Sequence, residues 1–281
     1  MAMVINTNTS SNNAVRLLDK TQRSQDITME RLTSGLRINS SKDDAAGLSV
    51  VTNMTTQIRG LDMALRNAND GLSMVQTMDA ALEEVTNMMQ RMRELGIQAM
   101  NGTYTSAQRA DMNVEFSQLT QEIARIASAT KFNGISIFAN AKMSNMSFQV
   151  GWENGDVNRI GSGQLVLSMS LNGMAASLQG VSIGGGSAGA ASGAVSLLND
   201  KLSQIQTTRA RWGAIMNRLD YTLNNLQSVK TNTESARSRI QDTDYAKEAA
   251  NLSRTQVLQQ AGMAMLSQSN QNSQNVMSLL R

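Results

Sequence analysis

The pattern of apolar positions predicts a long coiled-coil helix in the first half of the chain. Apolar residues recur in alternating steps of three and four from Val51 to Val75, a spacing that buries one seam of a helix against a partner helix. Asp79 interrupts the seam, which then continues, shifted by one residue, to Met92. The seam residues are Val51, Met54, Ile58, Leu61, Leu65, Ala68, Leu72, Val75, Leu82, Val85, Met89 and Met92.

The ends of this helix are marked by capping and turn residues. Ser41 is followed by Asp44 three residues later, a pair that resembles a capping box. A turn is expected at the Asn-Gly pair that begins at Asn101. We therefore predict a helix over about residues 41–100, followed by a shorter one over about 105–130 that folds back on the first.

A second long seam near the C-terminus supplies a partner for the first. Its residues are Leu198, Leu202, Ile205, Arg209, Trp212, Met216, Leu219, Leu223 and Leu226. This spacing predicts a helix over about residues 194–239 that pairs antiparallel with the first long helix. The core of a monomeric helical bundle would show the same seams, so the pattern alone leaves that alternative open.

The segment between the two seams has a different pattern. Two stretches alternate apolar and polar residues, one at Met146, Phe148 and Val150 and the other at Leu165, Leu167, Met169 and Leu171. Because the second stretch runs into Asn172 and Gly173, we predict small antiparallel hairpins within about residues 135–192. Residues 180–193 are mostly Gly, Ser and Ala, which is typical of a connector or exposed loop.

The two chain termini have helical propensity but sparse apolar stripes. Residues 19–26 are all polar, and no charged residue occurs from Thr255 to Leu280. Neither terminus can bury enough apolar surface alone to offset roughly 1–2 kcal/mol per residue of backbone ordering. We therefore expect each to become ordered only against neighbours. The complete pattern predicts a mainly α fold, a long antiparallel coiled-coil rod with small β-hairpins in its middle and helical termini.

Composition excludes most enzyme chemistry. The 281 residues include no Cys and no His, so a thiolate nucleophile, a His zinc ligand and the usual base at neutral pH are missing. We expect no enzymatic activity, no metal and no cofactor. The net charge is only +3, with no adjacent basic residues, which argues against a nucleic-acid partner. No apolar run is long enough to span a membrane, and no cleavable signal peptide is expected before Arg16.

Several motifs resemble those of bacterial flagellins. They are INTNTS from Ile5, ERLTSGLRINSSKDDAAGLSV from Glu30, RNANDGLSMVQT from Arg66, QRMRELGIQAMNGT from Gln90, FNGISIF from Phe132 and ARSRIQDTDYAKEAANLSRTQVLQQAGMAMLSQSNQNSQNVMSLLR from Ala236. The similarity covers about residues 1–138 and 195–281. The short segment between these regions makes the chain similar to flagellins that lack large outer domains.

The resemblance implies a secreted, extracellular filament subunit used in swimming. Residues 1–40 and 240–281 would form the helical inner tube of the filament on assembly, and residues 41–239 the rod. It also implies unfolded type III export without a cleaved signal, and export-apparatus, export-chaperone, filament-cap and hook-junction partners. The candidate self-assembly residues are Leu17, Leu18, Leu32, Leu258, Met265, Val276, Leu279 and Leu280.

Resemblance to flagellins detected by Toll-like receptor 5 adds a recognition surface. The residues it implies are Gln90, Arg91, Arg93, Glu94, Leu95, Gln98 and Glu115. Arg91 as an ordinary solvated charge on the outer face of the rod remains an open alternative.

Two other functional classes also stay open. A hook–filament junction protein would share the terminal helices. An enzyme domain inserted at residues 139–194 is disfavoured, because that segment has no His or Cys and only Glu153 and Asp156 as acids.

Overall fold

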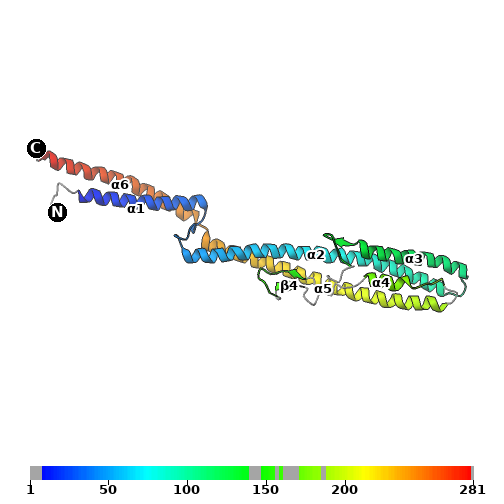
Figure 1. Ribbon diagram of the computed structural model, residues 1–281. Coiled ribbons are helices and arrows are strands. Elements are labelled where there is room, and N and C mark those ends of the chain that lie inside the picture. The colour runs from blue at the N-terminus through cyan, green and yellow to red at the C-terminus, as the bar shows by residue number, and fades with distance from the viewer. Residues whose placement is uncertain (1–7, 139–146, 156–157, 161–170, 185–187, 280–281) are drawn as a thin grey trace. The chain divides into compact units, whose positions relative to one another are not determined.

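The computed structural model consists of helices and small antiparallel strand pairs in two compact units (Figure 1). It describes residues 8–138, 147–155, 158–160, 171–184 and 188–279. The terminal unit comprises Met1–Thr56 and Thr231–Arg281, and the central unit comprises Gln57–Lys230. The prediction of a mainly α fold with small strand pairs is confirmed.

Two helices far exceed the others in length. The helices are α1 (Thr9–Ser34), α2 (Ala45–Met100), α3 (Ser106–Ala129), α4 (Leu171–Gln179), α5 (Ala188–Gln241) and α6 (Tyr245–Leu279). The strands are β1 (Lys131–Phe132), β2 (Ile135–Ser136), β3 (Phe148–Gln149) and β4 (Arg159–Ile160), paired antiparallel as β1 with β2 and β3 with β4. Helices of 56 and 54 residues (α2 and α5) are possible because no proline interrupts their hydrogen bonds.

Within the central unit, α2 and α5 pair antiparallel. The Asp62 carboxylate lies 2.6 Å from Lys230 Nζ, and Arg93 donates to the Asn199 side chain at 2.8 Å. Residue numbers therefore rise along α2 as they fall along α5. Among the seam residues, Val85 is fully buried, as are the other members of its shifted register. The predicted antiparallel seam is confirmed.

The charged residues that interrupt the two seams pair with each other. Arg209 of α5 donates through Nε to Asp79 Oδ1 of α2 at 2.7 Å, and its Nη2 lies 3.6 Å from Glu83 Oε2. The hydrogen bonds to Asp79 raise the pKa of Arg209 above its ordinary value. Because each charge sits where an apolar residue would continue the seam, only one register of α2 against α5 brings them together.

One prediction for the middle segment is wrong. The strand β3, which includes Phe148 of the first alternating stretch, pairs antiparallel with β4 as a small hairpin, and residues 165–170 of the second stretch lie outside the described part of the chain. Asn172 and Gly173 lie inside α4 instead of forming a turn. The reason is that the buried residues Leu171, Met174, Ala175 and Leu178 follow helical spacing.

The two long helices also begin differently from the prediction. Helix α5 starts at Ala188 and not near residue 194, so residues 188–193 are helical where the sequence predicted a connector or loop. Helix α2 starts after Asp44, whose carboxylate accepts from the Gly47 N–H at 2.9 Å and caps the helix by itself. The preceding turn is closed by Asp43, whose pKa is lowered by the backbone N–H groups of Ser40 and Asn39.

Candidate self-assembly and recognition surfaces

Helices α1 and α6, here called the terminal helix pair, pack side by side within the terminal unit (Figure 1). Gly262 of α6 lies directly against Leu18 of α1, because a Cβ added to Gly262 would lie 2.7 Å from Leu18 Cδ2. Any larger residue at Gly262 would require the Leu18 side chain to move. Leu18 therefore contributes to the contact between α1 and α6, and it is half-buried.

Polar groups make much of this contact. Arg31 of α1 forms an ion pair with the buried Glu248 of α6 at 3.2 Å. The Tyr245 hydroxyl donates to the Leu32 carbonyl at 3.0 Å, and the Gln259 amide donates to Gln22 at 2.9 Å. Hydrogen bonds of this kind exchange protein partners for water and stabilise modestly, by about 1 kcal/mol each.

The terminal helix pair leaves many of its larger apolar side chains in solvent. Among its described side chains, the buried ones are Thr28, Glu248 and Thr255, all polar or charged. The exposed apolar side chains are Val15, Leu17, Ile27, Met29, Val257, Leu258, Met263 and Met265, which are 43–66% exposed. Leu258 and Met265 lie seven residues apart and so share one face of α6. Such a surface is typical of helices that pack against further chains.

The structure places most of the predicted assembly residues on this pair. Leu17, Leu258 and Met265 are exposed, whereas Leu18, which lies against Gly262, and Leu32 are half-buried. Val276 and Leu279 belong to α6, with side chains outside the described part, and Leu280 lies outside the described residues.

A second surface forms where α2 meets α3 in the central unit. Arg91 of α2 donates to Glu115 of α3 at 2.8 Å and to Glu94, one turn along its own helix, at 3.1 Å. The hydrogen bond to Glu115, and then that to Glu94, hold the pKa of Arg91 above its ordinary value. All three side chains remain largely in solvent, so their ion pairs add little to stability.

The other predicted recognition residues divide between surface and core. Gln90, Arg93 and Glu94 line a shallow groove of about 410 Å³ against α5. The Gln98 amide donates to the Tyr104 hydroxyl at 3.0 Å. Leu95 is only 2% exposed and belongs to the core of the central unit. Its side chain therefore does not contribute to this surface, which is a correction to the predicted set.

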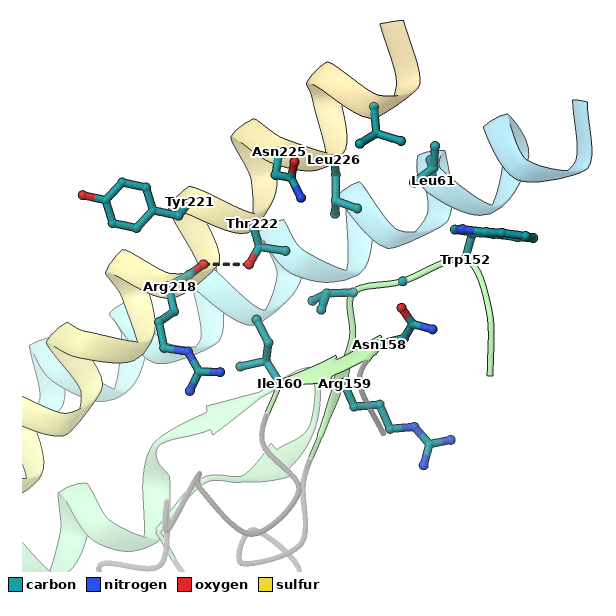
Figure 2. Close-up of a pocket in the computed structure, with 13 residues that line it drawn as sticks. Leu61, Trp152, Asn158, Arg159, Ile160, Arg218, Tyr221, Thr222, Asn225 and Leu226 are labelled. Atoms are coloured by element: carbon teal, nitrogen blue, oxygen red, sulfur yellow. Dashed lines mark hydrogen bonds between the residues drawn. The ribbon is translucent and has the colours of Figure 1, made fainter. Parts of the chain in front are cut away.

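A larger groove of about 540 Å³ lies between the β3–β4 hairpin and helices α2 and α5 (Figure 2). Leu61 and Leu226 form its apolar floor, and Trp152 and Tyr221 expose their rings at its edges. Thr222 uses its hydroxyl to bond the Arg218 carbonyl within α5. In the part of the chain that the structure describes, no three acidic, His or Cys side chains gather as a metal site would require.

Two sequence matches identify the protein family of this chain. The sequence model of the bacterial flagellin N-terminal helical region matches residues 5–143, and that of the C-terminal helical region matches residues 195–280. The chain belongs to the bacterial flagellin family. The two matches include both members of the terminal helix pair and all of α2 and α3.

Relatives of this flagellin match it over nearly its whole length. It is 39% identical to a flagellin of Halalkalibacterium halodurans, covering 99% of this chain and 100% of that one. It is also 39% identical to the flagellar filament 33 kDa core protein of Treponema phagedenis, with the same coverage. A solved structure described as a flagellar hook-associated protein of Vibrio parahaemolyticus, 15% identical, superposes with a TM-score of 0.57 over 71% of this chain and 100% of that chain and shows a shared fold.

Family membership makes this flagellin a structural subunit of the flagellar filament, an extracellular assembly, and not an enzyme. Among the described helices, none combines the length and the apolar character needed to cross a bilayer.

Sequence reasoning missed part of the exposed apolar surface of this flagellin. Val15, Ile27, Met29, Val257 and Met263 were not among the predicted assembly residues, yet all are exposed on the terminal helix pair. For Val257 and Met263 the available signal was the uncharged run that begins at Thr255, because an uncharged helix with apolar residues on several faces is typical of one buried on all sides.

Proposed function

We propose that this flagellin leaves the cell unfolded through the type III export apparatus and polymerises at the distal tip of the filament. Residues 1–40 and 240–281 then form the inner tube, and residues 41–239 form the surrounding rod. Its partners are other copies of itself, an export chaperone, the filament cap and the hook-junction proteins. A chain without Cys cannot form disulfide cross-links during export.

The observation that carries this proposal is the burial pattern of the terminal helix pair. The pair comprises helices of 26 and 35 residues, and ordering each residue costs about 1–2 kcal/mol. Among the described side chains of α1 and α6, no apolar one is buried to offset this cost. Neighbouring copies would cover the exposed residues, so folding of the pair and polymerisation would share one decrease in free energy.

The same reasoning predicts the geometry of the polymer. A polymer requires that the exposed apolar residues of one pair meet a different surface on the next copy, because a self-complementary contact would close two copies into a dimer. Contacts between unlike surfaces propagate without closing when the rotation does not complete a ring, which generates a helical tube.

Replacing the exposed apolar residues with glutamine tests this proposal. We expect Leu17→Gln, Leu258→Gln and Met265→Gln, combined in one chain, to raise the critical concentration for polymerisation about a hundredfold. Each side chain would lose about 1 kcal/mol of burial, since it is already partly covered, and about 1.4 kcal/mol is a factor of ten. Gln preserves helix propensity. Sedimentation of seeded samples over a concentration series measures the change.

The matched control replaces exposed apolar residues of α2 in the same way. Met63→Gln, Ile97→Gln and Met100→Gln, combined, alter side chains of the central unit that are 40–49% exposed. This control should polymerise near the wild-type critical concentration. An equal loss in both triple variants would contradict a specific role for the terminal helix pair.

We also propose that the cluster of Arg91, Glu94 and Glu115 is recognised by Toll-like receptor 5. The supporting observation is that two helices bring these charges together at one exposed position. Gln90 and Gln98 are also exposed on α2, whereas Arg93 faces α5, where it donates to the Asn199 side chain. Such a surface suits polar recognition, because its groups form charge-assisted hydrogen bonds without a large desolvation cost.

Arg91→Ala should abolish receptor signalling and leave assembly intact. A reporter cell line expressing the receptor measures the first property, and sedimentation of seeded filaments measures the second. Arg125→Ala is the matched control, because Arg125 is also an exposed arginine of the central unit in an ion pair with a glutamate, Glu122. Undiminished signalling by the Arg91 variant, or equal loss in the control, would show that Arg91 is an ordinary solvated charge.

A further inference from the structure

The methionines of this flagellin differ widely in solvent exposure. Met78, Met89 and Met92 are fully buried in the core of the central unit. Three methionines of the terminal helix pair are much more accessible: Met29 is 48% exposed, Met263 59% and Met265 66%. Thioether sulfur reacts according to its exposure, so a small oxidant reaches these three, like the exposed Met63 and Met100 of α2, before the buried methionines.

The chemistry of this reaction is simple. The methionine sulfur attacks one oxygen of hydrogen peroxide; an S–O bond forms as the O–O bond breaks. The departing hydroxide takes the proton from the transferred oxygen and leaves as water. The sulfur is oxidised by two electrons and the peroxide is reduced by two. The product, methionine sulfoxide, is polar where the thioether was apolar, so it disrupts apolar contacts.

We propose that Met29, Met263 and Met265 form a peroxide-sensitive modification site that blocks polymerisation of the free subunit. This inference rests on the proposed function, in which neighbouring copies cover these side chains. Met265 shares a face of α6 with Leu258, so its sulfoxide places a polar group on an assembly surface. Once a subunit is incorporated, the same contacts exclude the oxidant, and the filament protects the site that controls its growth.

Leucine substitution separates this site from the other methionines. Met29→Leu, Met263→Leu and Met265→Leu, combined in the full chain, keep apolar volume and helix propensity but cannot form a sulfoxide. The matched control is Met63→Leu with Met100→Leu, on α2, where the native side chains are 49% and 40% exposed. Each protein is treated with hydrogen peroxide as a monomer, freed of oxidant, and then seeded for polymerisation.

The proposal requires a specific order of results. Peroxide should raise the critical concentration of the wild type and of the control at least about tenfold, since each sulfoxide cancels the burial of an apolar side chain. The terminal leucine variant should stay within about twofold of its untreated value. Equal sensitivity of the terminal variant and the wild type would overturn the proposal, as would protection by the control substitutions.

Peptide mass spectrometry supplies a second measurement. In treated filaments, sulfoxide at Met29, Met263 and Met265 should be at least about tenfold less abundant than in treated monomer, because burial limits oxidation. Equal oxidation in monomer and filament would show that the filament does not shield these methionines. If the untreated wild type failed to polymerise, the proposed function itself would be wrong. If peroxide-treated wild type polymerised at its untreated critical concentration, only this inference would be wrong.

Discussion

A chain lacking residues 260–281 is expected to form no filaments at any accessible concentration. The deletion removes Gly262, where α6 packs against Leu18, and the exposed Met263 and Met265. It leaves the α2–α5 seam of the central unit intact, so circular dichroism should still report a largely helical protein. Electron microscopy and sedimentation of seeded samples would show monomer where the full chain forms long polymers.

The interpretation of this truncation depends on two comparisons. The full chain under identical conditions shows that the seeds are active. Truncated protein added to the full chain should neither enter the polymer nor change its final amount, because it lacks half of the terminal helix pair contact. Filaments of normal length from the truncated chain would show that the terminal helix pair is not required.

The second large effect concerns the stability of the central unit. Trp212→Ala is expected to lower the free energy of unfolding by about 3–5 kcal/mol, the range typical of emptying a buried aromatic site. Trp212 is 1% exposed, and its ring centroid lies 6.5 Å from that of Phe138. Urea unfolding followed by circular dichroism measures the change as a lower midpoint with a similar slope.

The protein provides its own control in the second tryptophan. Trp152 is 45% exposed at the edge of the groove in Figure 2. Trp152→Ala retains the Cβ atom that faces Gly60, so its effect on unfolding should be below about 1 kcal/mol, as for surface substitutions. If the two alanine variants were equally stable, Trp212 would not be the core residue that its burial indicates.

The sequence predicted the long helices well because their pattern is redundant. Each of the two seams repeats its spacing over many turns, so one irregular residue does not hide the period. The short elements were harder. The alternating stretch that ends at Leu171 predicted a turn at Asn172 and Gly173, whereas Leu171 begins a helix whose further apolar residues, Met174 and Leu178, carry the decisive spacing.

The same contrast holds for the candidate surfaces. The motif around Arg91 named a set of residues, but a linear sequence cannot show that Leu95 turns into the core while Glu115 returns from α3 to meet Arg91. Likewise, the sparse apolar stripes of the termini predicted that each terminus becomes ordered only against neighbours. They could not show that Leu18 packs against Gly262 while Leu17 is left in solvent.

By itself, the sequence determined the helical fold, the pairing of the two seams and the resemblance to flagellins, because periodicity and motifs are properties of residue order. Only the tertiary structure decided which residues face one another across helices, as Arg209 faces Asp79, and which apolar side chains remain uncovered. Those outcomes depend on register and on the direction of each side chain, and both become defined only when segments distant in sequence are packed together.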